Sequence, residues 1–248
     1  MNLFLKIGKR YRIGEDMNIP GYLVEQGTVD SRWNREFEEQ LNDFERGLLN
    51  FYKPIELYRL QQTVIAICGA GGIGSNCAMS LARSGMCQFI IIDMDCVEWS
   101  NLNRQAYFPY HVGRYKVDAL EELLKSINPH ITVQTHRERL TKENVLHYVS
   151  GAHILVEAFD DVTSKADFYN ATSQLVMPRI MVSGVAGVGG ASPACVKKMG
   201  KNLYIVGDGK SSTEYESPYA PRVTMAANQQ ADVVLSLVLG KEVFYETL

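Results

Sequence analysis

A glycine-rich turn between a short apolar run and a helical pattern leaves this chain few possible folds. The letters GAGGIG occupy positions 69–74, directly after the β-branched run Thr63–Cys68. In this context Gly69 permits a tight turn, Gly71 lets the backbone approach a phosphate, and Gly74 lets the helix pack closely on the strand. The helix N-terminus then offers free amides and a partial positive charge to an anion. The turn therefore predicts a nucleotide site on an α/β sheet.

Strand-like and helix-like segments alternate through the rest of the chain. We expect strands at Thr63–Cys68, Gln88–Asp93, Ile131–His136, His153–Ala158 and Arg179–Val185. The intervening segments predict helices at Gly74–Arg83, Lys116–Ser126, Lys142–Val149 and Ser164–Leu175. This alternation predicts a Rossmann-type α/β fold, with a mostly parallel sheet and helices on both faces. Two later strands form a predicted antiparallel C-terminal extension of the sheet before a last helix, and these three elements are Cys195–Met199, Leu203–Val206 and Val223–Leu239.

The chain before the glycine turn has a different pattern. Residues 1–30 mix glycine, proline and charged residues with no sustained period, which predicts loops or short extended pieces. From Ser31 onward, apolar residues recur at helical spacing and predict one amphipathic helix with its apolar face at Phe37, Leu41, Phe44 and Leu48. We therefore divide the chain into an N-terminal segment, 1–60, and a nucleotide-binding domain, 61–248.

Composition and charge argue against several classes of protein. With 46% apolar and 21% charged positions among 248 residues, the chain can bury a substantial core. A formal charge of −3 gives no general reason to bind nucleic acid or a membrane surface. The five cysteines form no CxxC pair, and no apolar run approaches the roughly 18 residues of a membrane span. We expect a cytoplasmic protein.

The acid that follows the glycine turn leaves two chemistries open. Asp93 ends the second predicted strand, where a carboxylate can accept ribose hydroxyl protons. A glycine turn with such an acid occurs most often in enzymes that bind NAD or FAD, so the motif alone favours an NAD-dependent oxidoreductase. Hydride transfer would also need an acid or base near the nicotinamide, and the five histidines show no obvious pairing with a carboxylate in the sequence.

The segment after Asp93 favours phosphate chemistry instead. Its letters MDCVEWSNLNRQ fill positions 94–105, and Lys116 follows eleven residues later. When a carboxylate attacks the α-phosphate of ATP, one anion approaches several others, so the site needs cations rather than a base. Arg104 and Lys116 can supply those cations. Further candidate contacts in this segment are Asp95, Asn101, Asn103 and Gln105.

Two acids follow the strand predicted at His153–Ala158. They stand at the carboxyl end of a parallel strand, where ligands bind in open α/β sheets. A carboxylate there can hold the Mg²⁺ that neutralises the β- and γ-phosphates, and we assign this role to Asp160. Asp161 is well placed to cap the following helix.

Four segments together resemble the ubiquitin-activating-enzyme-like adenylyltransferases: GAGGIGS, DMDCVEWSNLNRQ, GRYKVDAL and VEAFD. The resemblance runs from about Gln61 to Gly240. Later segments, including GKNLYIVGDG and APRV, are most similar to the shorter thiamin-pathway form, ThiF family 2. This resemblance implies a homodimer that adenylates the C-terminal glycine of a ubiquitin-like, ThiS-like sulfur-carrier protein ending in Gly-Gly and releases pyrophosphate. Related enzymes activate a tRNA base or a peptide carboxylate, which remains an alternative.

The resemblance also implies roles for individual residues. Arg104, Lys116 and Asp160 would be catalytic, and Asp160 would be the metal ligand. An N-terminal arginine of related dimers reaches the partner's ATP, which makes Arg35 a candidate. Many relatives hold structural zinc on two CxxC pairs that this chain lacks, so we expect no zinc. The full predicted ATP-binding set is Gly69, Gly71, Gly72, Gly74, Asp93, Asp95, Asn101, Asn103, Arg104, Gln105, Lys116 and Arg35.

Overall fold

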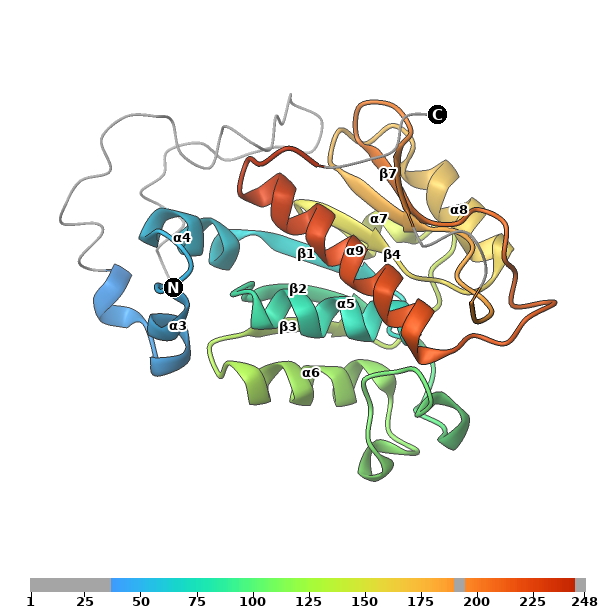
Figure 1. Ribbon diagram of the computed structural model, residues 1–248, viewed down its shortest axis with the longest axis horizontal. Coiled ribbons are helices and arrows are strands. Elements are labelled where there is room, and N and C mark those ends of the chain that lie inside the picture. Colours follow the sequence, from blue (N-terminus) through green and yellow to red (C-terminus); the bar gives the residue numbers. More distant parts are fainter. Residues whose placement is uncertain (1–36, 190–194, 244–248) are drawn as a thin grey trace.

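The computed structural model describes residues 37–189 and 195–243, which form a sheet with helices on both faces (Figure 1). Seven strands of this part of the chain make one sheet in the order β3-β2-β1-β4-β5-β7-β6. The strands are β1 Val64–Cys68, β2 Gln88–Ile92, β3 Thr132–His136, β4 Ile154–Glu157, β5 Arg179–Val182, β6 Cys195–Lys198 and β7 Leu203–Gly207. The predicted fold class is confirmed.

The strand β1 shows why the sheet is covered on both sides. Ile65 and Ile67 pack into one core cluster with the helices α5 Gly72–Arg83, α6 Lys116–Ile127 and α9 Ala220–Val238. Ala66 and Cys68 point the other way, into a second cluster with α7 Val145–Tyr148 and α8 Val162–Thr172. A strand buried on both faces reads as a continuous apolar run, and that is the pattern of this segment.

The C-terminal strands extend the sheet in two different senses. β7 pairs with β5 in parallel from Arg179↔Leu203 to Val182↔Val206, and β6 pairs with β7 antiparallel at the edge. Only β6 therefore runs against the other strands in the described part of the chain. The hairpin predicted from the sequence is present, and its second strand belongs to the parallel sheet.

The predicted amphipathic helix of the N-terminal segment is two helical pieces instead of one. Residues 37–40 are helical, the helix stops at Leu41, and α3 runs over Asp43–Leu48. Asn42 causes the break, because its side chain accepts a hydrogen bond from the amide of Glu45 and so caps α3. A further helix, α4 Pro54–Gln62, was not predicted. Arg35 lies outside the described residues, and the division at residue 60 stays a prediction.

A buried carboxylate attaches these helices to the amino end of the sheet. Glu45 of α3 is almost fully buried, and its Oε1 atom accepts hydrogen bonds from Gln61 Nε2 and Asn128 Nδ2, both at 2.9 Å. The Nδ1 atom of His130 lies 2.9 Å from the same carboxylate. These partners stand just before β1 and β3 in the chain, so Glu45 joins elements that are far apart in sequence.

Candidate functional site

A cavity of about 790 Å³ lies at the carboxyl ends of the parallel strands. Residues that follow β1, β2, β3, β4 and β5 all contribute to its wall, together with part of the loop between β7 and α9. Open α/β sheets bind ligands at this edge because the strand ends and helix N-termini meet there. The predicted residues on its wall are Gly69, Gly71, Gly72, Asp93, Asp95, Arg104, Gln105, Lys116 and Asp160.

The glycine turn has the geometry that phosphate binding requires. Gly69 has a φ of +101°, in the left-handed region that favours glycine. A side chain at Gly74 would collide with the carbonyl oxygen of Gly69, so this glycine allows the helix to begin close to the strand. Gly71 is the N-cap of α5 and makes no side-chain cap, and a Cβ atom there would meet only Gln105 Nε2, at 3.9 Å. The N-terminus of α5 is therefore open to the cavity.

Asp93 at the end of β2 ties the glycine turn to the following segment. Its two oxygens accept hydrogen bonds from the amides of Ala70, at 2.7 Å, and Asp95, at 2.8 Å. Burial raises the pKa of Asp93, and the nearby Lys116 and the two amides offset this only in part. Each carboxylate oxygen keeps a further lone pair, so Asp93 can still accept a ribose hydroxyl.

Lys116 lines the cavity and forms an ion pair with Asp95. Its Nζ atom lies 2.7 Å from Asp95 Oδ2, and its side chain is only 8% exposed. The pairing was not part of the prediction, which treated the lysine as a free cation. Asp95 fixes the ammonium at the cavity, and the other N–H groups of Lys116 can still reach a phosphate.

Arg104 and Gln105 lie beside the glycine turn. Nη1 of Arg104 donates to the carbonyl oxygen of Ser100, at 3.2 Å, and to Asn103 Oδ1, at 2.8 Å, and no described carboxylate pairs with it. The Oε1 atom of Gln105 is buried on the cavity wall without a hydrogen-bond partner in the described chain. An unpaired cation and an unpaired buried oxygen are what a polar ligand would satisfy.

Among the predicted contacts within the described residues, three do not line the cavity. Gly74 serves the close packing of α5 described above. Asn101 is buried and accepts a hydrogen bond from the amide of Glu98, at 3.1 Å, so it shapes the turn η1 Trp99–Asn101. Asn103 is exposed and holds Arg104. The two asparagines thus build the segment that carries the arginine.

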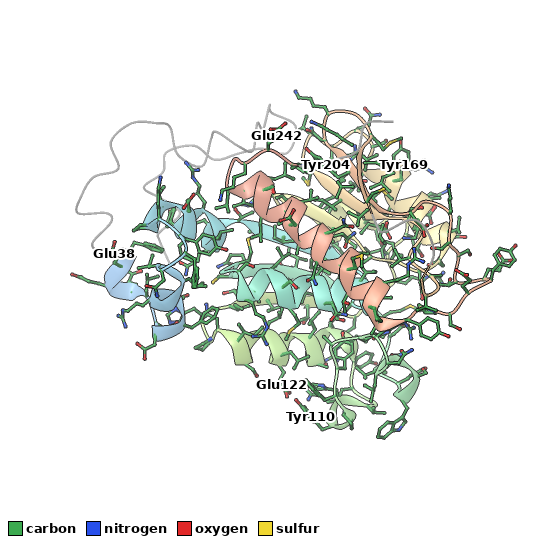
Figure 2. All side chains as sticks on the ribbon, viewed as in Figure 1. Glu38, Tyr110, Glu122, Tyr169, Tyr204 and Glu242 are labelled. Atoms are coloured by element: carbon green, nitrogen blue, oxygen red, sulfur yellow. The ribbon has the colours of Figure 1, made fainter. Side chains whose placement is uncertain are left out.

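The loop between the two predicted cations is braced by a buried histidine. His111, in the turn η2 Pro109–His111, accepts a hydrogen bond from the amide of Phe108 at Nδ1, at 3.0 Å. Glu122 of α6 lies 3.7 Å from the other ring nitrogen. Figure 2 shows Tyr110 near Glu122, at the outer end of this loop. Burial lowers the pKa of His111, which favours a neutral ring with a structural role.

The carboxyl end of β4 supplies the opposite wall. Asp160 is exposed on the cavity wall and makes no hydrogen bond or ion pair with another described residue. Asp161 caps α8 by accepting a hydrogen bond from the amide of Ser164, at 2.7 Å, which confirms its predicted role. The two neighbouring acids therefore have different surroundings, and only Asp160 is free to bind a cation.

Comparison with known families identifies the group to which this chain is related. The model of the ThiF family matches residues 44–248. The chain belongs to the ThiF family. This result agrees with the resemblance found in the sequence at the level of the superfamily.

Curated relatives of this ThiF-family chain have different activities. It is 34% identical over 143 residues to a tRNA threonylcarbamoyladenosine dehydratase of Haemophilus influenzae, a match covering 57% of this chain and 55% of that protein. It is 36% identical over 105 residues to ubiquitin-like modifier-activating enzyme 5 of Rattus norvegicus, a match covering 42% of this chain and 25% of that protein. It is 33% identical over 129 residues to the adenylyltransferase and sulfurtransferase MOCS3 of Anopheles gambiae, a match covering 52% of this chain and 29% of that protein. The matched region spans about half, or less, of each relative.

Solved structures share the fold of this ThiF-family chain. The E. coli tRNA N6-threonylcarbamoyladenosine dehydratase TcdA in complex with AMP aligns with a TM-score of 0.71 at 21% identity, covering 86% of this chain and 98% of that chain. E. coli MccB with AMPCPP and MccA aligns with a TM-score of 0.64 at 22% identity, covering 84% of this chain and 69% of that chain. At this level of identity the likeness is one of fold.

A buried ion pair in the ThiF-family site was not among the predicted residues. Glu157, the last residue of β4, is fully buried, and its Oε1 atom lies 2.8 Å from Lys165 Nζ on α8. Burial raises the pKa of Glu157, and Lys165 opposes this shift. The sequence signal was an acid inside an apolar strand with a lysine eight residues later, since such an acid needs a partner.

The loop between β7 and α9 is also part of the site. Ser211, Ser212 and Thr213 line the cavity. Asp208 holds the base of this loop by accepting the amides of Lys210 and Ser211, both at 2.8 Å, and by pairing with Arg222 at 2.9 Å. Its polar sequence indicates a surface loop and gives no sign that the loop lines a site.

Two features are absent from the described residues. No group of three or more His, Cys, Asp or Glu side chains in this part of the chain is arranged to hold a metal ion. No helix within residues 37–189 and 195–243 is long and apolar enough to cross a membrane. The expectations of no structural zinc and a cytoplasmic location stay predictions.

Proposed function

We propose that this protein is an ATP-dependent adenylyltransferase that transfers AMP to a carboxylate and releases pyrophosphate. The observation that carries the proposal is the content of one cavity: an open helix N-terminus after a glycine turn, two cations from the segment after β2, and an unpaired acid after β4. A dehydrogenase needs only the first of these and the acid at the end of β2. The cations favour a triphosphate substrate.

Some residues of the cavity would bind the nucleotide, and others would stabilise charge in the transition state. The amides at the start of α5 and the glycine turn would hold the phosphates, and Asp93 would accept the ribose hydroxyls. Arg104 and Lys116 would stabilise negative charge that builds up as the carboxylate oxygen bonds to the α-phosphorus and pyrophosphate leaves. The attacking carboxylate is already ionised at neutral pH, so no general base is required.

Asp160 has the chemistry of a magnesium ligand. It is a carboxylate on the cavity wall with no hydrogen-bond or ion-pair partner in the described chain. Mg²⁺ takes one or two protein carboxylates together with phosphate oxygens, and when bound it would neutralise charge on the β- and γ-phosphates. Asp160 would hold the ion on the side of the cavity opposite Arg104.

The substrate that we propose is the C-terminal glycine of a ThiS-like sulfur-carrier protein ending in Gly-Gly. Its support is the resemblance of the later segments to the thiamin-pathway form, and the presence of protein-activating relatives such as ubiquitin-like modifier-activating enzyme 5. A homodimer, with Arg35 reaching the partner's nucleotide, belongs to the same proposal.

A carboxylate on a tRNA base is the second candidate substrate. A specific observation favours it: the relative from Haemophilus influenzae is a tRNA threonylcarbamoyladenosine dehydratase, and its match covers more of this chain than the matches to the modifier-activating enzyme and MOCS3 given above. The formal charge of −3 is against it, because a large polyanion needs a basic surface.

Exchange of labelled pyrophosphate into ATP tests the function and separates the substrates. The purified protein is assayed alone, with a ThiS-like carrier, with the same carrier lacking its terminal Gly-Gly, and with modified tRNA. Exchange that depends on the intact carrier supports the first proposal, and exchange that depends on tRNA supports the second. Background exchange in every arm, together with thermal stabilisation by NADH but not by ATP–Mg²⁺, would mean that the adenylyltransferase assignment is wrong.

A further inference from the structure

The cavity carries a cation on the β4–β5 side that the proposed mechanism does not use. Lys165, the fourth residue of α8, lines the cavity with a side chain that is 23% exposed. Its Nζ atom donates to Glu157 Oε1 and to the carbonyl oxygen of Val182, both at 2.8 Å. The ammonium is therefore held in one place at the end of the sheet.

The strands β4 and β5 separate where this lysine is held. Their pairing runs through Leu155↔Arg179 and Val156↔Ile180, and Glu157 comes next in β4. There the amide of Val182 donates to the Glu157 side chain, at 3.2 Å, in place of a main-chain carbonyl. The buried carboxylate thus fills the opening between the two strands, and Lys165 lies above it on the cavity side.

Lys165 has bonding capacity left. An ammonium group has three N–H donors, and the two contacts with Glu157 and Val182 use two of them. The third has no acceptor within the described residues, on a side chain that lines the cavity. A ligand in the cavity can therefore accept a charge-assisted hydrogen bond from Lys165 without breaking either existing contact.

The distribution of charge indicates which ligand this would be. Among the described residues of the cavity wall, Arg104 and Lys116 follow β2, Arg139 follows β3, and Lys165 is the only cation on the β4–β5 side. Asp160, on the same side, is the proposed Mg²⁺ ligand, so Lys165 is the side chain there that can bind an anion directly. With the ribose at Asp93 and the phosphates at the glycine turn, this side of the cavity is the one left for the second substrate.

We infer that Lys165 binds the attacking carboxylate of the second substrate and that Glu157 positions Lys165 for this role. The inference rests on the proposed adenylyl transfer. One carboxylate oxygen accepts the hydrogen bond from Lys165, and the other forms the bond to the α-phosphorus while the bond to pyrophosphate breaks. No proton moves, because the lysine stays charged and the carboxylate enters ionised. Lys165 therefore selects an acid over a neutral end group.

The test compares a carboxylate with a carboxamide. Binding of a ThiS-like carrier ending in Gly-Gly, and of the same carrier with a C-terminal carboxamide, is measured by calorimetry with a non-hydrolysable ATP analogue present. The wild-type protein should bind the acid about tenfold or more tightly than the amide, the value of one charge-assisted hydrogen bond. Lys165→Met should bind both equally and keep its affinity for the ATP analogue. Lys142→Met, at an exposed lysine, is the matched control.

A second variant separates this role from a structural one. Lys165→Met alone leaves a buried carboxylate without its cation, which destabilises the fold. Adding Glu157→Gln removes that charge, so the double variant should recover most of the lost thermal stability. It should nevertheless fail to prefer the acid over the amide, whereas Lys165→Arg should keep the preference.

Two results would overturn the inference. If the double variant regains the preference for the acid together with its stability, Lys165 is only structural. If Lys165→Met itself discriminates as well as the wild type, another group binds the carboxylate. Wild-type pyrophosphate exchange is measured in parallel, because a wild type that is inactive with every carboxylate contradicts the adenylyl transfer itself.

Discussion

The two ends of the parallel sheet differ in one respect: the amino end holds a buried carboxylate with its hydrogen bonds made, whereas the carboxyl end keeps two charges unpaired beside its ion pairs. At the amino end, Glu45 is buried and its Oε1 atom accepts hydrogen bonds from Gln61 and Asn128. At the carboxyl end, Asp160 and the guanidinium of Arg104 pair with no described group of opposite charge. A fully paired group stabilises the fold, and an unpaired one keeps its interaction energy for a ligand. Changes at the two ends should therefore separate stability from activity.

The largest effect is expected from Arg104→Ala at the carboxyl end. Loss of one preorganised contact to the transition state should lower the rate of pyrophosphate exchange about 100-fold to 1,000-fold, or about 3 to 4 kcal/mol. The free energy of unfolding should change little, because Arg104 holds only the neighbouring turn. Exchange kinetics and chemical denaturation measure the two quantities.

The control for this variant is Arg114→Ala, which removes an arginine paired with Glu122 outside the cavity wall. Equal losses of activity in both variants would contradict the assignment of Arg104 to the site.

Glu45→Ala tests the amino end and should have the reverse effect. It removes the acceptor of two buried amide groups, Gln61 Nε2 and Asn128 Nδ2, and should lower the free energy of unfolding by about 3 kcal/mol. Below its melting temperature the variant should still bind ATP with wild-type affinity. Asp43→Ala removes an exposed acid from the same helix and should be nearly neutral. Weakened ATP binding by folded Glu45→Ala would show that the two ends are coupled.

The glycine turn allows the same separation within one motif. Gly74→Ala should lower the free energy of unfolding by about 2 kcal/mol, because the new methyl group collides with the Gly69 carbonyl oxygen and α5 must shift. Gly71→Ala should leave stability unchanged, since its methyl group would meet only Gln105 Nε2 at an ordinary contact distance of 3.9 Å, and should weaken ATP binding. Thermal melts with and without ATP–Mg²⁺ measure both. Normal ATP binding by Gly71→Ala would mean that the phosphates do not bind at the glycine turn.

At the carboxyl end, Asp208 is a paired acid whose contribution to stability should depend on pH. Burial alone would raise the pKa of Asp208, but hydrogen bonds from the amides of Ser211 and Lys210 and the nearby Arg222 lower it overall from 3.8. A carboxyl whose folded-state pKa is depressed stabilises the fold above its unfolded pKa, and this contribution is lost as the pH falls through the folded pKa.

Asp208→Asn should therefore cost about 1 kcal/mol of stability at pH 7. The difference between wild type and variant should disappear below the depressed pKa, under pH 3.8. Urea denaturation of both proteins across this range measures it. A difference that stays constant with pH would show that the charge of Asp208 contributes nothing.

Short-range patterns in the sequence were enough to predict the strands of the sheet and much of the candidate site. The continuous apolar letters of β1 and β2 and the glycines at 69–74 allow few other local structures, because each is a short-range constraint on the backbone. The capping role of Asp161 could be predicted for the same reason. The placement of Arg104 and Lys116 on one wall followed from the end of β2, which brings that segment to the carboxyl edge.

The pairing of the buried charges is visible only in the folded structure. The contacts of Glu45 with Asn128, of Lys116 with Asp95 and of Lys165 with Val182 join residues from different elements. Their separation in sequence gives no periodic signal, and the partners meet only after the strands have taken their places in the sheet. Electrostatic energy depends on distance and burial, so a residue type in the sequence cannot show whether its charge is used for stability or left for a ligand.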